Sequence, residues 1–228
     1  MAGARRDGER EGHEKQDAAG APSLALAELL ASRLCHDLAG AVGTLAGALE
    51  LAGSEPATVA DALLIGGEVA SAMAERLRLW RAAWAADAAE PLDGVGLRRL
   101  CRGLPERVRL DADDLDPGWH WPSGPARVLL NALLLGAESL PAGGVLTLAS
   151  AGAGALLLVP EGPRAAWPAG FAGFLTDTRA AWRAVATATP RRVQAPLTVL
   201  VAEKEDVGLG FALAGAPEAA PPLMLRRR

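Results

Sequence analysis

The sequence predicts an α + α/β sandwich, in which an N-terminal antiparallel helical hairpin is followed by a two-layer α+β domain. Two observations lead to this prediction. In the first part of the chain, hydrophobic residues recur at alternating steps of 4 and 3 over two long stretches, which is the spacing of bundled helices. Beyond Pro91 the period changes to short alternating stretches separated by Gly- and Pro-rich turns. We expect a disordered tail over 1–22, the hairpin over 23–90, the α+β domain over 91–215 and a frayed tail over 216–228.

The hairpin is predicted from two long helices joined by a short turn at 53–56. The first runs from about Leu24 to Leu51 and the second from about Ala57 to Asp87. A lone hairpin leaves its apolar seam half open, whereas two hairpins side by side close a four-helix bundle. We therefore expect a homodimer with two-fold symmetry. The alternative is that the seam packs on the second half of the same chain.

The second domain is predicted from shorter elements. We expect a short helix over 95–103, a strand over 107–111, and a helix from Ser123 that is apolar almost all round and therefore buried against a sheet. Two strands at 145–149 and 155–159 form a hairpin, and a helix follows over 170–188. A last hairpin is expected from strands at 197–202 and 207–213. Strands in hairpins with helices on one face make a two-layer α+β domain.

Composition excludes several classes of function. Half of the 228 residues are hydrophobic, which is enough for a packed core, and the formal net charge of −4 provides no basic footprint for nucleic acid or an anionic membrane surface. The two cysteines have no CxxC or His–Cys spacing, which argues against a disulfide scaffold and a structural zinc site. The first 22 residues contain no apolar run of the kind found in signal peptides or membrane anchors. We expect a cytoplasmic protein that binds neither nucleic acid nor membrane.

His36 stands near the middle of the first predicted helix, on the side opposite its leucines. A histidine ring nitrogen can accept a phosphoryl group and release it readily, so an exposed histidine on a rigid helix is a candidate nucleophile. The adjacent Asp37 could orient the imidazole or take its proton, and Arg33 could meet an incoming phosphoryl group or acidic surface. The alternatives are an inert surface histidine and an ordinary solvated arginine.

Small residues surround His36 on the surface of this helix. With a turn of 100° per residue, Ser32, Gly40, Gly43 and Gly47 all lie within about 40° of it. Each helical glycine costs about 1 kcal/mol relative to alanine, so three on one face, about 3 kcal/mol together, need a reason. One reason is that the backbone of a partner must come close. The other is that these glycines face the sister helix or the second domain, where small residues also permit close packing.

The stretch LCHDL at 34–38 resembles the dimerisation and phosphotransfer region of bacterial histidine kinases, because it lies on the first helix of a hairpin that precedes an α+β domain. More closely, the chain from about Leu24 to Leu213 resembles the ChpT-like histidine phosphotransferases of alphaproteobacteria. Kinase motifs of this type usually carry a proline five residues after the histidine, where this chain has Ala41. That departure puts autokinase geometry in doubt more than phosphotransfer.

The stretch NALLLGAESLPAGG at 131–144 resembles the kinase N-box pattern NLxxNAxEAxPxGG, which implies a Bergerat-like domain. Asn131 matches the first asparagine, but the second, which in kinases helps hold the magnesium of ATP, is replaced by Leu135. Leucine cannot coordinate a hard cation, and no DxGxG motif follows. We therefore expect a degenerate domain and no cofactor or metal bound by this chain, with Glu138 a surface residue at the helix end. The alternative is that this stretch is only a buried Leu-rich helix followed by a turn, in which Asn131 caps the helix or bridges neighbouring backbone groups.

The resemblance implies a phosphorelay protein, a phosphotransferase without autokinase or ATPase activity. His36 would be the phosphoacceptor and Asp37 its orienting carboxylate, and receiver domains would bind at Ser32, Arg33, Gly40, Gly43 and Gly47. The donor would be the receiver domain of a hybrid histidine kinase. The acceptors would be response regulators, among them a cell-cycle master regulator and a proteolysis adaptor, and the receivers would supply magnesium. The alternatives are an ATP-dependent histidine kinase core and a non-catalytic dimeric adaptor in which His36 is incidental.

Overall fold

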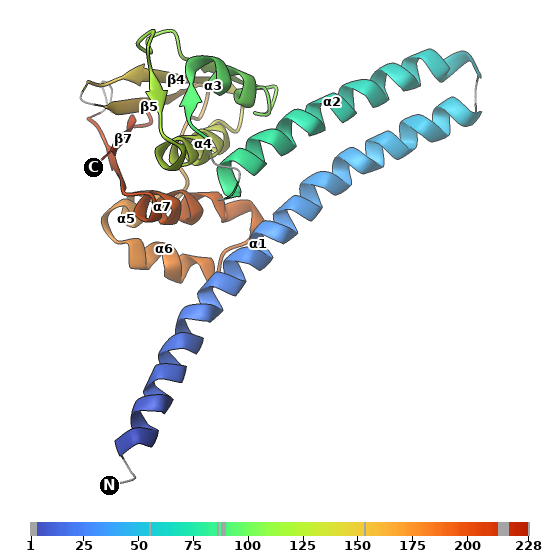
Figure 1. Cartoon of the computed structure of the whole chain (residues 1–228). Coiled ribbons are helices and arrows are strands. Elements are labelled where there is room, and N and C mark those ends of the chain that lie inside the picture. Colours follow the sequence, from blue (N-terminus) through green and yellow to red (C-terminus); the bar gives the residue numbers. More distant parts are fainter. Residues whose placement is uncertain are drawn as a thin grey trace.

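The computed structural model describes residues 4–54, 56–85, 87, 90–152, 154–213 and 219–227, with the backbone alone for 4–22. The first two helices, α1 (Ala4–Ser54) and α2 (Val59–Trp84), are joined through the 3-10 helix η1 (Pro56–Thr58). They run antiparallel as a long hairpin whose far end projects away from the rest of the molecule (Figure 1). The structure therefore contains the predicted hairpin.

The segment 1–22 differs from the expected disordered tail, because the backbone from Ala4 onward already belongs to α1. Ala, Glu and Arg, which have high helix propensity, make up about half of this segment, although it also contains several glycines and Pro22. Once the packed part of α1 provides a nucleus, adding further helical residues is much less costly than starting a new helix. Residues 1–3 lie outside the described part of the chain.

The hairpin is held by small side chains and keeps large apolar ones on its surface. Ala48 and Ala62 are buried, and Gly66 faces Leu45 across the two helices. By length and composition, Pro56–Trp84 is the one stretch of the described chain that could cross a membrane. Several large apolar side chains of the hairpin are exposed, namely Val42, Leu49, Leu51, Leu63, Leu64, Ile65 and Leu77. So many exposed apolar side chains are typical of an interface with another molecule.

The second domain is built on a mixed five-stranded sheet in the order β2-β4-β5-β7-β6. Its strands are β2 (Val108–Asp111), β4 (Gly144–Ser150), β5 (Ala155–Glu161), β6 (Val207–Phe211) and β7 (Leu223–Arg227). β2 pairs with β4 in parallel, and the other pairs are antiparallel. β1 (Leu92–Asp93) and β3 (His120–Trp121) form a separate pair, and α3 (Gly94–Cys101) follows β1. Together with the helices of this domain, the sheet confirms the predicted class of a helical region followed by an α+β domain.

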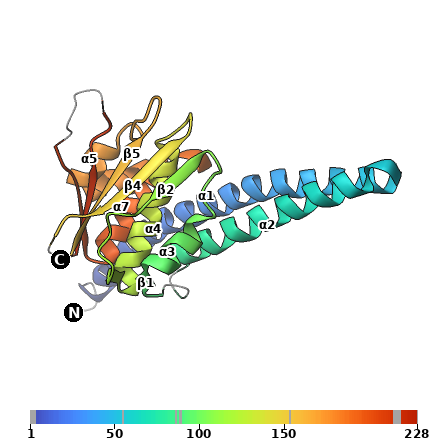
Figure 2. The same cartoon turned by 90° about the horizontal axis from the view of Figure 1, so that it is seen from above.

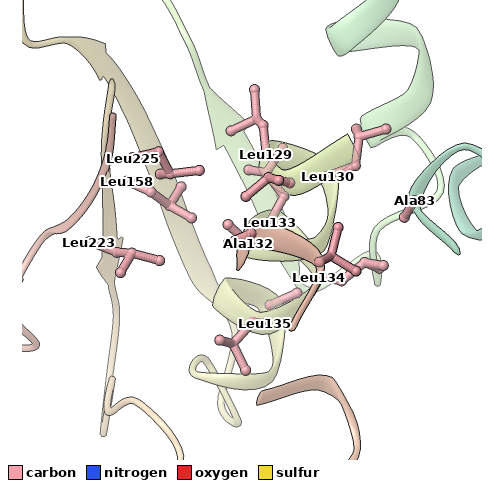
Figure 3. Close-up of a cluster of buried hydrophobic side chains, with 14 of the residues drawn as sticks. Ala83, Leu129, Leu130, Ala132, Leu133, Leu134, Leu135, Leu158, Leu223 and Leu225 are labelled. Carbon is pink, nitrogen blue, oxygen red and sulfur yellow. The ribbon is translucent and has the colours of Figure 1, made fainter. Parts of the chain in front are cut away.

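The core is organised around α4 (Ser123–Glu138), which is buried on nearly all sides. Its leucines lie between Leu158, Leu223 and Leu225 of the sheet and Ala83 near the end of α2 (Figure 3). A second buried helix, α7 (Gln194–Lys204), packs beside α4 under the sheet (Figures 1 and 2). The burial expected for the apolar helix after Ser123 is therefore confirmed.

The helix predicted over 170–188 is in fact two short helices, α5 (Phe171–Thr176) and α6 (Thr178–Val185). The break falls at Asp177, whose carboxylate accepts a hydrogen bond from the backbone N–H of Arg179 at 2.9 Å. An aspartate in extended conformation that bonds in this way is a helix N-cap, so it starts a new helix in the middle of the apolar pattern.

The strand predicted at 197–202 is wrong, because this segment belongs to the helix α7. Its run of Leu, Thr and Val favours a strand by propensity. A continuous apolar run also fits a helix that is buried on every side, and periodicity does not separate the two. The packing of α7 beside α4 decides the outcome.

The frayed tail predicted over 216–228 is also wrong for the part that the structure describes. Residues 223–227 form β7, which lies between β5 and β6, and Leu223 and Leu225 are fully buried. β6 therefore pairs with β7 rather than with the 197–202 segment. The boundary expected at 215/216 lies outside the described residues.

Candidate phosphotransfer site

His36 lies on α1 where this helix passes the second domain, and its side chain is 61% exposed. Its Nδ1 is 3.1 Å from a carboxylate oxygen of Asp37, and its Nε2 is 3.3 Å from a guanidinium nitrogen of Arg191. An ionised carboxylate only accepts hydrogen bonds, and a guanidinium only donates them. Both contacts are satisfied by the neutral tautomer that carries its proton on Nδ1. This arrangement leaves the lone pair of Nε2 as the nucleophile.

Arg191 comes from η3 (Pro190–Arg192), a 3-10 turn between α6 and α7. The backbone N–H of Arg192 donates to the carbonyl of Thr189 at 2.8 Å, and the next residue, Val193, is fully buried. The turn is therefore anchored to the core, although the Arg191 side chain is on the surface. His36 and Arg191 are 155 residues apart, so no local pattern in the sequence predicts this pair. Its only sequence signal is two adjacent arginines.

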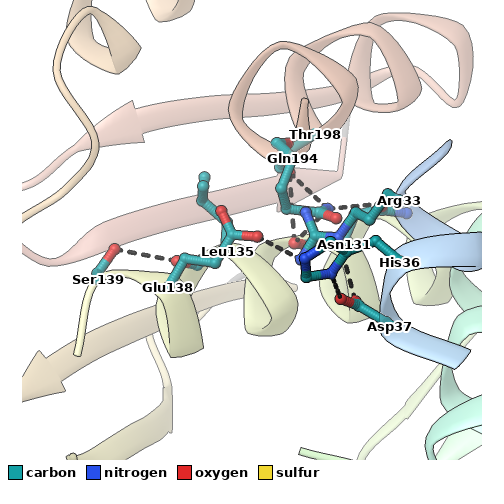
Figure 4. A network of polar contacts seen from close by, with 9 residues as sticks. All are labelled: Arg33, His36, Asp37, Asn131, Leu135, Glu138, Ser139, Gln194 and Thr198. Carbon is teal, nitrogen blue, oxygen red and sulfur yellow. Dashed lines mark hydrogen bonds and ion pairs between the residues drawn. The ribbon is translucent and has the colours of Figure 1, made fainter. Parts of the chain in front are cut away.

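Arg33 links the hairpin to the second domain. One of its guanidinium nitrogens lies 2.6 Å from a carboxylate oxygen of Glu138, at the end of α4 (Figure 4). Arg33 also lies 3.9 Å from the carboxylate of Asp37 and over the ring of Trp84. Arg33, expected to meet a receiver, is thus engaged within the chain.

Glu138 is not the surface residue that the sequence predicted. Burial raises its pKa, and the charge of Arg33 works against that rise. Desolvation disfavours the ionised carboxylate, whereas the adjacent guanidinium favours it. The sequence does not predict this role, because Glu138 ends an apolar helix and its partner is on a distant helix.

A pocket of about 1160 Å³ opens between α1 and the second domain, with Ser32 and His36 in its wall. Four arginines face two carboxylates there, so the balance of charge is positive. Such a pocket suits a phosphoryl group or an acidic protein surface. Its charged wall residues are Arg33, Asp37, Arg107, Glu138, Arg191 and Arg192.

The glycines of α1 lie beyond this pocket, towards the tip of the hairpin. A Cβ atom added at Gly40, Gly43 or Gly47 would meet nothing within 4 Å. Within the described chain, neither α2 nor the second domain packs closely on this face. The structure therefore brings Ser32, Arg33, His36 and Asp37 together at the pocket and leaves the three glycines as an open strip that continues from it.

Asn131, the residue of the N-box resemblance, has a structural role. Its amide nitrogen donates to the backbone carbonyls of Ala83 at 2.7 Å and Arg127 at 2.9 Å, and its amide oxygen accepts from Gln194 at 3.0 Å (Figure 4). Both Asn131 and Leu135 are fully buried. Asn131 thus bridges α2, α4 and α7. Among the described residues, no group of three His, Cys, Asp or Glu side chains is placed to hold a metal ion.

Comparison with known proteins identifies the family of the second domain. The family model of the histidine phosphotransferase C-terminal domain matches residues 95–217, which is over half of the chain. A solved structure of a bacterial phosphotransferase is similar with a TM-score of 0.64, at 20% identity, over 89% of this chain and 95% of the other. That likeness shows a shared fold, and no curated protein matches. By its second domain, the chain belongs to the histidine phosphotransferase family.

Proposed function

We propose that this chain accepts a phosphoryl group on Nε2 of His36 from the aspartate of one receiver domain and passes it to the aspartate of another. The observation that supports this most strongly is the setting of His36. Its ring is exposed on a rigid helix, with Nδ1 against Asp37 and Nε2 towards a positively charged pocket. Membership of the histidine phosphotransferase family supports the same chemistry. An inert surface histidine would not need charged groups at both ring nitrogens.

The proposed transfer balances in atoms and charge. The lone pair of Nε2 attacks the phosphorus of the receiver's aspartyl phosphate, and the N–P bond forms as the P–O bond to the aspartyl carboxyl group breaks. That carboxylate leaves with the electron pair. The proton on Nδ1 stays on the ring, where the carboxylate of Asp37 stabilises the positive charge that the ring gains. The reverse step on a second receiver completes the relay, and catalysis is mostly positioning.

Two different faces of the hairpin serve the two kinds of partner. Val42 and Leu49 are largely exposed and lie on the side of α1 away from His36 by helical periodicity. A second hairpin that covers them would close a four-helix bundle and leave both copies of His36 open. This homodimer explains the apolar surface better than a membrane does, because Leu79 and Trp80 of α2 are buried in the protein core.

The receiver would dock on the glycine strip and over the pocket. A strip without side chains lets the backbone of a partner come close, which supports the glycines as part of the docking surface. From the family resemblance, the donor is the receiver of a hybrid histidine kinase. The acceptors are response regulators of the cell cycle, and transfer takes place in the cytoplasm with magnesium bound by the receivers.

We also propose that transfer does not use ATP. The amide of Asn131 is buried and engaged by three partners, and Leu135 lies in the core. The large pocket borders His36 and not these two residues. An ATP-dependent kinase core is therefore the weaker candidate.

The test supplies a receiver domain phosphorylated on its aspartate with labelled phosphate and compares the full-length wild type with His36→Ala. Label should move to the wild type and not to the variant. Equal labelling of both proteins, or of neither, would contradict phosphotransfer through His36. A parallel incubation with labelled ATP alone should leave the wild type unlabelled, and self-labelling at His36 would overturn the ATP-independent function.

A further inference from the structure

We propose that Arg191 is a catalytic residue of the transfer, because its guanidinium binds the phosphoryl group that Nε2 of His36 carries. This inference rests on the proposed function and adds a residue of the second domain to the reacting centre. The contact that carries it is the 3.3 Å distance between a guanidinium nitrogen of Arg191 and Nε2, the ring nitrogen left as the nucleophile by the contact of Nδ1 with Asp37.

In the unphosphorylated protein, a guanidinium nitrogen of Arg191 faces Nε2 of His36. A phosphoryl group bonded to Nε2 occupies the position in front of this ring nitrogen. Its oxygens then lie one bond beyond the phosphorus, within reach of the same side chain. Arginine suits this task, because its planar fork of N–H groups binds two phosphate oxygens at once. The side chain is long and exposed, so it can swing from the ring nitrogen to the incoming oxygens without disturbing the core.

The charges around His36 give Arg191 this role rather than Arg33. Arg33 pairs with Glu138 at 2.6 Å and lies near Asp37, so two carboxylates already oppose its charge. Among the described residues, Arg191 makes no ion pair with a carboxylate, and its guanidinium contacts His36 itself. Its positive charge is therefore available to the phosphoryl oxygens, which carry nearly two negative charges.

The buried network around Asn131 positions Arg191. Gln194, three residues after Arg191, begins α7, and its amide nitrogen donates to Asn131 at 3.0 Å. Asn131 in turn holds the end of α2 through Ala83. Asn131 of α4 thus fixes the start of α7 against the hairpin. We infer that the second domain serves the reaction by holding Arg191 over the histidine.

The experiment uses potassium phosphoramidate, a small donor that phosphorylates histidine as its own N–P bond breaks and ammonia leaves. This donor needs no receiver, so it separates the chemistry at His36 from docking. Phosphorylation of His36 in the full-length protein is followed by phosphorus NMR and intact mass. Arg191→Gln should slow the reaction about ten- to hundred-fold, since it removes one charge-assisted hydrogen bond to the phosphoryl group. Arg191→Lys should recover part of the rate.

The matched control is Arg183→Gln, which removes an exposed arginine of α6 paired with Asp177 and should react like the wild type. With a phosphorylated receiver, Arg191→Gln should lower the maximal transfer rate more than it raises the half-saturating receiver concentration. Equal rates for the wild type and Arg191→Gln with phosphoramidate would overturn the role of Arg191 while leaving the relay through His36 intact. Failure of the wild type to be labelled at His36 by either donor would instead overturn the proposed function.

Discussion

The three glycines beside His36 offer a test in which stability and function move in opposite directions. Replacing Gly40, Gly43 and Gly47 together by alanine should make α1 more stable. A Cβ atom at each position meets nothing within 4 Å, so no strain opposes the gain in helix propensity. At about 0.8–1.0 kcal/mol for each position, the triple variant should gain roughly 2.5–3 kcal/mol. For a chain of this size, that gain corresponds to a rise in Tm of about 5–10 °C.

The same three methyl groups should weaken receiver docking. They project from the strip over which we propose that the partner backbone passes, and forcing extra methyl groups into a close contact typically costs about 1–3 kcal/mol. This cost corresponds to a rise of about 5- to 150-fold in the receiver concentration that gives half-maximal transfer. Labelling of His36 by phosphoramidate should not change, because that donor needs no docking surface.

The assay combines thermal unfolding with transfer from a phosphorylated receiver over a range of receiver concentrations. Gly67→Ala is the matched control, since this glycine of α2 is also helical and open, and alanine there should stabilise without affecting transfer. A triple variant that is more stable and transfers like the wild type would refute the reasoning, because the glycines would then have no docking role. A triple variant that is less stable would refute the claim that their surroundings are empty.

Three further predictions concern the dimer interface, the ion pair between Glu138 and Arg33, and the buried hydrogen-bond network around Asn131. Leu63→Glu, at a side chain that is 61% exposed in one chain, should convert a dimer to a monomer in light scattering, whereas a monomeric wild type would contradict the dimer. Because burial raises the folded-state pKa of Glu138 above its ordinary 4.5, the folded protein keeps a proton that the unfolded chain has lost just above that pH. The free energy of unfolding should therefore fall as the pH rises through this range, and Glu138→Gln should remove that decline in urea titrations; identical slopes would contradict it. Asn131→Ala should destabilise the fold by about 1–3 kcal/mol in the same titrations, since the amide of Gln194 and the carbonyl of Ala83 each lose one of their buried hydrogen-bond partners, and a neutral change would show that this bridge is dispensable.

The sequence predicted best where a short-range period carries the information. The heptad spacing located the hairpin, and the same geometry placed His36 on the side away from the leucines, where the structure finds it exposed. The helix after Ser123 was also recognisable, because only a buried helix is apolar on every side. The departure at Leu135 was visible in the sequence as well, and the structure places this residue in the core.

Local patterns gave wrong predictions where a segment was buried on all sides or where a single residue ended one helix and began the next. The apolar run at 197–202 fits a strand and a buried helix equally, so only its packing beside α4 makes it α7. The strand near the end of the chain is only five residues long, which is too short for its alternation to be recognised in the sequence. Its place between β5 and β6 depends on the rest of the sheet.

The sequence alone determined the rigid helix, the exposed histidine, its neighbouring carboxylate and the bare glycine face, because all of these belong to one helix and follow from its repeat. Only the tertiary structure decided what surrounds Nε2. The contact of Arg191 with His36 and the pairing of Glu138 with Arg33 join segments that are distant in the chain. Each contact depends on how α4, α7 and the hairpin pack together, and this packing is set by the whole core rather than by any local pattern.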